Sequence, residues 1–283
     1  MTRRLAVVVP VFNEASGILP TLDALARQDD NDFDAVFVDN ASTDGSAQVV
    51  ETFIHRHGLS RWRVVHEPQK GTGAAADSGM REAIAQGARL LARTDADCLP
   101  RLDWTASIRR ALTPVTDGGL GLRLVGGELI PRRDEGLGWP TRTALRGAVH
   151  LAEAFGRLRP GNRDPAYQGP YMMAAGCNVG ITAELYEKAG GFPRSRIEDL
   201  HEDRALVNAV RRLTSDYQRR SDVVVYASSR RAQAWGLTNT LLWYKDHAYR
   251  PPEVDIRDPA LVDRIPRRSI VATRRKTRSS GVS

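Results

Sequence analysis

The sequence has few of the features that mark secreted, membrane-spanning or disulfide-stabilised proteins. Only two of its 283 residues are cysteines, Cys98 and Cys177. Two are too few for a disulfide framework and predict a reducing, cytoplasmic environment. No apolar run approaches the roughly 20 residues of a membrane span. The longest early run, LAVVVPVF at residues 5–12, also lacks the layout of a secretory signal.

An excess of charge is absent from most of the chain. Residues 264–283 carry seven basic and no acidic side chains; removing those seven from the 41 basic residues leaves 34, which balances the 34 acidic ones. A neutral body lacks the basic face that nucleic-acid binding requires. The tail is predicted to be disordered, and either only solubilises the chain or attracts it weakly to the anionic inner face of a membrane.

The first hundred residues alternate apolar runs with segments of helical periodicity. The runs, each predicted to be a buried strand, lie at 4–12, 34–40, 62–67 and 88–93. The segments between them, each predicted to be a helix, lie at 16–28, 44–57 and 73–88. This order predicts an α/β fold with an open, mostly parallel sheet and helices on both faces.

The remainder of the chain is less regular. Strands are predicted at 122–130 and 222–228, and helices at 139–158, 181–192, 201–213 and 235–250. The helix at 139–158 has an apolar stripe that includes Phe155 and Leu158. That stripe either packs on the core or faces an acceptor or a second subunit.

Polar groups follow each of the four early strands. They are NEA at 13–15, DNAST at 39–43, KGTG at 70–73 and DADC at 95–98. In open α/β sheets, ligands bind outside the carboxyl ends of the strands. The four groups are therefore predicted to converge on one binding site.

The second and third of these groups suit a nucleotide. A carboxylate at Asp39 can accept the imide N–H of uracil, although this stretch could equally cap the next helix. Phe12 either stacks on a base or belongs to the core. Gly71 and Gly73 would let the backbone approach an anion at a helix N-terminus.

Asp95 and Asp97 form a D-x-D pair at the end of the fourth predicted strand. In an extended strand, residues i and i+2 point the same way. One carboxylate could then reach a ribose and the other a hard divalent cation that neutralises a diphosphate. The alternative for such a pair is a solvated turn.

Two further acidic pairs lie about a hundred residues on, in IEDLHEDRAL. They are Glu198–Asp199 and Glu202–Asp203. Acids at a helix start often only complement the helix dipole. The other interpretation is a general base that removes a proton from an acceptor hydroxyl.

Taken together, these motifs resemble the family 2 glycosyltransferases of the Rossmann-like GT-A fold. The matching stretches, over roughly residues 5–215, are VVVPVFNEA, VDNASTDGS, KGTGAAADSG, TDADC, AAGCNVGI with GGF, and HEDRAL. The resemblance implies a catalytic domain over 1–220, with a nucleotide half over about 1–100 and an acceptor half over about 101–220. An extension over 221–263 and the basic tail over 264–283 follow.

The resemblance also implies an inverting enzyme that uses a nucleotide-diphosphate sugar, with UDP expected, a hydroxyl acceptor, and Mn²⁺ or Mg²⁺. It assigns to the nucleotide the residues Pro10, Phe12, Glu14, Asp39, Lys70, Asp77 and Asp95. Asp97 would bind the metal with Asp95 close by, and His247 is a candidate third ligand. The family's spacing favours Asp203 over Asp199 as the base, with Glu202 beside it.

Departures from the family pattern indicate which kind of family member to expect. Asp77 stands where many members have Asn, and the Q-x-x-R-W motif of processive synthases is missing from RRAQAWG. A single-sugar transferase is therefore expected. The alternatives are a non-catalytic nucleotide-sugar-binding protein and a sugar nucleotidyltransferase. The latter would want a basic residue after the first strand, where PVFNEASG has none.

The D-x-D assignment gives a direct test. Replacing the metal-binding carboxylate in Asp97→Asn is expected to abolish turnover at ordinary metal concentrations, because the amide cannot neutralise the cation. Nucleotide release measured across a Mn²⁺ titration checks this. Full activity with unchanged metal dependence would show that Asp97 is not a ligand.

Overall fold

The first four apolar runs form a parallel sheet. β1 (Leu5–Val11) lies between β2 (Phe33–Asp39) and β4 (Leu90–Arg93), and β3 (Trp62–His66) pairs with β2. Val11 is aligned with Asp39, and Asp39 with His66. The strands therefore end together, so the loops that follow them start at one edge of the sheet.

Beyond β4 the sheet continues with antiparallel strands. β7 (Val179–Thr182) pairs with β4, and β6 (Leu124–Pro131) pairs with β7. β8 (Tyr217–Ala227) and the short β5 (Leu99–Pro100) complete an order of β3-β2-β1-β4-β7-β6-β8-β5 among the described residues. The predicted α/β class with an open sheet is confirmed.

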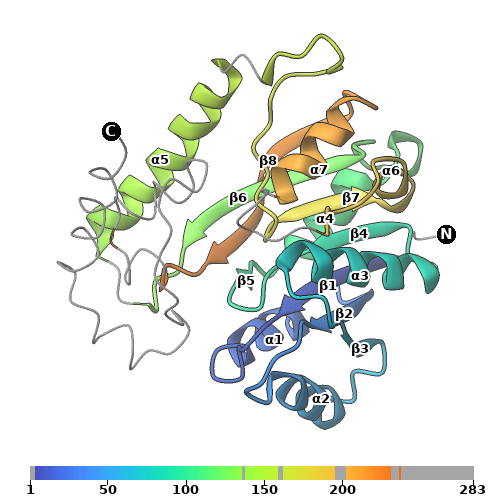
Figure 1. Cartoon of the computed structure of the whole chain (residues 1–283), viewed down its shortest axis with the longest axis vertical. Coiled ribbons are helices and arrows are strands. Elements are labelled where there is room, and N and C mark those ends of the chain that lie inside the picture. Colours follow the sequence, from blue (N-terminus) through green and yellow to red (C-terminus); the bar gives the residue numbers. More distant parts are fainter. Residues whose placement is uncertain (1–3, 136–137, 159–161, 195–201, 231–235, 237–283) are drawn as a thin grey trace, which may run out of the picture. The chain divides into compact units, whose positions relative to one another are not determined.

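Helices cover both faces of this sheet (Figure 1). One face packs on α1 (Leu19–Ala26), α2 (Ser46–His57) and α4 (Trp104–Leu112). The other packs on α3 (Thr72–Ala85), α6 (Ala183–Lys188) and α7 (Glu202–Arg211). In β1, Val7 and Val9 belong to the first core and Ala6 and Val8 to the second. Burial on both faces explains why the run is apolar throughout.

The elements predicted in the first hundred residues agree with the observed ones to within three residues at each end, whereas α4 and β5 were not predicted and β8 begins five residues before the predicted strand at 222–228. The helix predicted over 181–192 starts later, because residues 179–182 form β7 and only 183–188 are helical. Gly180 permits this close pairing, since a Cβ there would lie 2.9 Å from both Ile108 and Val125. Long-range pairing has thus overridden the local periodicity.

The remaining elements are a 3₁₀ turn, η1 (Val115–Asp117), and α5 (Trp139–Leu158). α5 has the bounds predicted for it. Phe155 and Leu158 of its apolar stripe are 63% and 62% exposed, so neither is buried in a core. Near its end, Glu153 pairs with Arg219 of β8 at 2.5 Å.

The computed structural model describes residues 4–135, 138–158, 162–194, 202–230 and 236. Two units are distinguished, one over 1–130 and 146–227 and the other over 131–145 and 228–283. β8 runs across residue 220, where the sequence suggested a boundary. The basic tail, His247 and the pair Glu198–Asp199 lie outside the described residues. In the described part, no helix is long and apolar enough to span a bilayer.

Close packing of α3 on the sheet predicts a stability difference. A Cβ on Gly79 would lie 2.4 Å from Val8 Cγ1 and 2.7 Å from Val38 Cγ2. Gly79→Ala is expected to lower the free energy of unfolding by about 1–3 kcal/mol through overpacking. Gly147→Ala, at an exposed site in α5 with nothing within 4 Å, is the control. It should raise that free energy by about 0.4–1 kcal/mol. Urea unfolding of both variants distinguishes the two effects, and equal midpoints would contradict the packing argument.

Candidate active site

The loops after β1 and β2 are joined by hydrogen bonds. The backbone N–H of Asn13 donates to Ser42 Oγ at 3.1 Å, and that of Glu14 to Ser46 Oγ at 2.8 Å. Asn13 Oδ1 in turn accepts from the N–H of Thr43 at 2.9 Å. Asn13 has a φ of 51°, in the left-handed region that asparagine tolerates. These loops therefore form one connected surface at the carboxyl edge of the sheet.

The residues predicted to bind the nucleobase lie on or beside this surface. Pro10 is within β1, Glu14 is buried, and Asp39 ends β2 with 7% exposure. Asp39 Oδ2 lies 3.2 Å from His66 Nδ1, and its Oδ1 accepts the N–H of Ser42 at 3.4 Å. The last contact lies within the loop and does not cap α2, whose N-cap residue is Gly45 and which has no side-chain cap hydrogen bond. His66 adds a polar neighbour that the motif did not suggest.

Phe12 and Lys70 come together from separate loops. The Lys70 ammonium lies 5.6 Å from the centroid of the Phe12 ring, a cation–π distance. Phe12 is only partly buried and Lys70 is exposed. An aromatic face and a cation at the mouth of the site suit a base and a phosphate.

The loop before α3 is shaped by Asn40. Its amide donates to the carbonyls of Glu67 and Gln69 at 2.9 and 2.7 Å, and its Oδ1 accepts from Gly71 N–H at 2.8 Å. Gly71 has a φ of 142°, which favours glycine. Gly73 is equally constrained, because a Cβ there would lie 2.2 Å from a backbone carbonyl of the loop before residue 194.

Asp77 is buried and bound by other protein groups. It accepts hydrogen bonds from Tyr186 Oη and Arg81 Nε, both at 2.9 Å. A Cβ on Gly191 would lie 2.6 Å from its Oδ1. Asp77 thus ties α3 to α6 and the glycine pair that follows α6. Its contact with a nucleotide stays a prediction.

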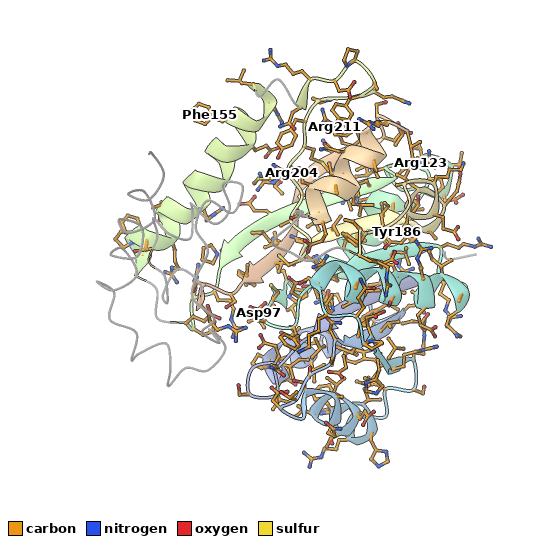
Figure 2. The ribbon with its side chains drawn as sticks, viewed as in Figure 1. Asp97, Arg123, Phe155, Tyr186, Arg204 and Arg211 are labelled. Carbon is orange, nitrogen blue, oxygen red and sulfur yellow. The ribbon has the colours of Figure 1, made fainter. Side chains whose placement is uncertain are left out.

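Asp95 and Asp97 lie in a turn after β4, with Asp97 at the carboxyl edge of the sheet (Figure 2). The N–H of Cys98 donates to the carbonyl of Asp95 at 3.1 Å, which closes the turn. The expectation of an extended i, i+2 pair is therefore wrong in geometry. Aspartate favours the first position of such a turn, and the two carboxylates remain close enough for Asp97 to raise the pKa of Asp95.

Glu202 and Asp203 begin α7, as the sequence predicted for this helix. The carboxylate of Asp203 accepts the N–H of Arg204 at 2.7 Å and that of Gly176 at 3.3 Å. Burial, followed by the nearby Glu202 carboxylate, raises the pKa of Asp203 to about 6. A carboxylate with this pKa is ionised at neutral pH yet is a better proton acceptor than an ordinary aspartate.

Two arginines of this region were missed in the sequence. Arg93, the last residue of β4, is 1% exposed and contacts both Asp95 and Glu202. Arg194 pairs with Glu67 at 2.8 Å and donates to Ser78 Oγ at 2.9 Å. A charged residue closing an otherwise apolar buried strand was the available signal for Arg93. No local pattern marked Arg194.

The two cysteines also meet at this site, although 79 positions separate them. Cys98 Sγ lies 3.5 Å from Asp97 Oδ1. A hydrogen bond with Cys177, together with burial, raises the pKa of the Cys98 thiol. Both cysteines are free thiols.

The donor chemistry of the D-x-D turn fits a hard divalent cation, since it offers carboxylate oxygens. Among the described residues, no group of three or more His, Cys, Asp or Glu side chains is arranged to hold a metal. A cation held by this turn would therefore need further ligands, which the phosphate oxygens of a ligand and water can supply.

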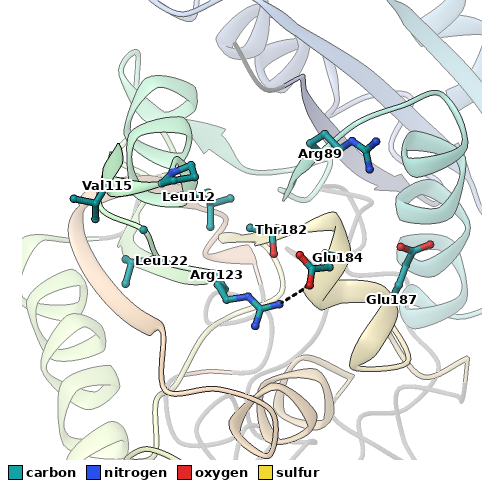
Figure 3. A pocket seen from close by; sticks show the side chains of 10 residues that line it. Arg89, Leu112, Val115, Leu122, Arg123, Thr182, Glu184 and Glu187 are labelled. Carbon is teal, nitrogen blue, oxygen red and sulfur yellow. Dashed lines mark hydrogen bonds and ion pairs between the residues drawn. The ribbon is translucent and has the colours of Figure 1, made fainter. Parts of the chain in front are cut away.

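A cavity of about 630 Å³ lies at the opposite edge of the sheet (Figure 3). Its lining includes Arg89, Thr182 and the ion pair between Arg123 and Glu184, at 3.4 Å. None of the predicted site residues contributes to it. A smaller pocket is lined by Asp203, Gly176 and Phe192.

Part of the chain is similar to known glycosyltransferases. Residues 6–125 match the family model described as glycosyl transferase family 2. Glycosyltransferase AglE of Haloferax volcanii is 30% identical over 126 residues, which cover 44% of this chain and 38% of that protein. The chain thus spans well under half of that relative's length. The match to family 2 glycosyltransferases covers residues 6–125, which is less than half of the chain.

Solved structures share the fold. A mannosyltransferase of Pyrobaculum calidifontis, PcManGT in complex with GDP-Man and Mn²⁺, superposes with a TM-score of 0.59 at 22% identity, over 93% of this chain and 69% of that one. Staphylococcus aureus TarS 1–349 with UDP-GlcNAc gives 0.56 at 16% identity, over 80% and 58%.

Because Glu202 contributes to the raised pKa of Asp203, the substitution Glu202→Gln is predicted to change that pKa. Removing the neighbouring negative charge is expected to lower the pKa of Asp203 below about 6. Because only the ionised carboxylate accepts a proton, any rate that depends on it falls as pH drops through that pKa. A ¹³C titration of the Asp203 carboxyl measures the midpoint. Glu187→Gln, at the opposite edge of the sheet, should leave it unchanged. A midpoint unmoved by Glu202→Gln would mean that the two carboxylates do not interact.

Proposed function

We propose that this chain transfers one sugar from a nucleotide-diphosphate sugar to an acceptor hydroxyl with inversion at the anomeric carbon. The observation that carries the proposal is Asp203. Asp203 lies in the first turn of α7, and the pKa of its carboxyl is raised. The neighbouring Glu202 contacts the Arg93 guanidinium, which also contacts Asp95 of the D-x-D turn. A base and a diphosphate-binding turn in one site are what this reaction needs.

The base acts on the acceptor. Asp203 takes the proton of the acceptor hydroxyl as its oxygen forms a bond to the anomeric carbon. The bond from that carbon to the diphosphate oxygen breaks on the opposite side, and the nucleoside diphosphate leaves with its electron pair. One bond forms as one breaks at a single carbon, so the configuration inverts.

The leaving group needs positive charge. Asp97, with Asp95, would hold a divalent cation, which when bound neutralises the diphosphate. The relative solved with GDP-Man and Mn²⁺ supports both a metal and a nucleotide sugar. Lys70 and the N-terminus of α3 would add positive potential from this chain's own groups.

The donor base is the finer part of the proposal. Asp39 can accept the imide N–H of uracil, which supports a UDP-sugar. A carboxylate can accept the ring N–H of guanine in the same way, and the neighbours carry both GDP-Man and UDP-GlcNAc. UDP-sugars and GDP-sugars are therefore tested side by side.

The test measures nucleoside diphosphate release from a panel of UDP- and GDP-sugars, with Mn²⁺, Mg²⁺ or EDTA. Acceptors include polyprenyl phosphates, cell-envelope glycans and small hydroxyl compounds. Release is expected from one donor class, dependent on metal and acceptor. Asp203→Asn should reduce it by at least about a hundredfold, the lower end of the range for loss of a general base.

The matched control is Asp216→Asn, an exposed aspartate that lies outside the site. It should keep wild-type release. If the wild-type chain binds a donor but releases no more nucleoside diphosphate than Asp203→Asn does, it is a non-catalytic nucleotide-sugar-binding protein. Release by Asp203→Asn at the wild-type rate would remove this residue as the base.

A further inference from the structure

Arg93 is a charged side chain almost wholly removed from water. It closes β4, whose other residues are apolar, and its side chain is 1% exposed. Burial alone would lower the pKa of Arg93, but the Asp95 and Glu202 carboxylates raise it, so the guanidinium is cationic. A buried cation is stable only when opposite charges surround it.

The guanidinium joins two segments that are far apart in sequence. Nη2 lies 3.2 Å from Asp95 Oδ1 and 3.4 Å from Glu202 Oε1, while Nε lies 3.3 Å from the same Asp95 oxygen. Asp95 belongs to the D-x-D turn, and Glu202 begins the helix that carries Asp203. One side chain therefore contacts both functional segments of the site.

The Arg93 side chain is closely packed by the residues around it, and this packing is not favourable in every respect. A Cβ on Gly176 would lie 2.9 Å from Arg93 Nη1, so the guanidinium would have to shift to admit a larger residue there. The guanidinium carbon lies 5.0 Å from the centroid of the Phe192 ring. Nη1 has no hydrogen-bond partner among the described residues. Unpaired buried donors are unfavourable, and an apolar side chain often serves stability better than a buried ion pair.

The charges explain what the cation does. Burial raises the pKa of Asp95 and of Asp203, and the neighbouring carboxylates raise both further: Asp97 and Glu202 act on Asp95, and Glu202 acts on Asp203. Without a cation between them, the start of α7 and the D-x-D turn would repel each other. Because Gly176 also donates to Asp203, the arginine, the glycine and the base form one packed group.

We infer that Arg93 is a positioning residue, which holds the base-bearing start of α7 against the donor-binding turn by bridging Glu202 and Asp95. This inference rests on the proposed function for its effect on rate. Its structural content, the fixing of Glu202, stands separately. Arg93 acts through the two carboxylates and does not itself reach the reacting atoms.

Arg211 offers a matched control. It is also 1% exposed and lies on α7, where it donates to the carbonyl of Asn162 at 2.8 Å and stacks on Tyr167 at 3.9 Å. Like Arg93, it has one buried nitrogen without a partner, Nε. Arg211→Met removes a buried arginine of equal burial that makes no contact with the site's carboxylates.

Two measurements on Arg93→Met, Arg93→Lys and Arg211→Met test the inference. The first is amide hydrogen exchange over residues 202–206, below the melting temperature of every variant. Arg93→Met should exchange faster there than wild type, whereas Arg211→Met should not. Unchanged protection in Arg93→Met would overturn the inference whether or not any donor is turned over.

The second measurement is steady-state kinetics with the donor that the panel identifies. Arg93→Met should lower kcat on the order of a hundredfold, the loss that a misplacement of about 1 Å can cause, with a smaller change in donor KM. Arg93→Lys should recover part of kcat, since lysine keeps the positive charge but lacks the planar guanidinium with its several donors. Arg211→Met should keep wild-type kcat.

A double-mutant cycle separates positioning from general destabilisation. If Arg93 acts through Glu202, then Arg93→Met combined with Glu202→Gln loses less kcat than the product of the two single losses. Strictly multiplicative losses, or an equal loss of kcat in Arg211→Met, would overturn the inference. If wild type turns over no donor, the proposed function fails and the exchange measurement alone decides on Arg93.

Discussion

The structure depends on a parallel sheet buried on both faces. Parallel strands cannot be joined by tight turns, so each connection crosses a face as a helix and returns to the same starting edge. In this chain β1, β2 and β3 end in register, from Val11 through Asp39 to His66. The loops that follow these strands therefore leave the sheet from that one edge. The composition of the site follows from this constraint, because folding of the sheet brings together polar groups that are distant in sequence.

Converging loops must also be held in place, and this chain does so with side chains bonded to backbone. Asn40 and Ser46 each satisfy backbone groups of a neighbouring loop. Loops held in this way keep their polar groups oriented before a ligand arrives, which reduces the entropy lost on binding. Between the D-x-D turn and the start of α7 the corresponding device is electrostatic, because Arg93 balances carboxylates from these two segments. Asn178 plays a purely structural part, since it accepts from Trp104 Nε1 at 2.9 Å and donates to two strand carbonyls.

Much of this could be predicted because the decisive signals were local. Continuous apolar runs and segments of helical periodicity placed the four parallel strands and the helices between them, and α5 was predicted with its observed bounds. The D-x-D turn and the acidic start of α7 were recognisable as short motifs. β7 was not predicted, because a four-residue strand in an antiparallel position is stabilised by its neighbours β4 and β6 rather than by its own sequence. The turn at Asp95 was expected to be extended, since nothing in TDADC distinguishes a strand end from a turn.

The sequence by itself determined the α/β class, the edge of the sheet where the polar loops gather, and the residue types found there. Those properties depend on periodicity and on short motifs, which each segment carries alone. Only the tertiary structure decided which charges face each other. It placed Arg93 between Asp95 and Glu202, 109 residues from the latter, turned Asp77 toward Tyr186, and put the two cysteines side by side. These are long-range electrostatic and packing relations, and they exist only once the chain has folded, because burial both removes water from the charges and selects their partners.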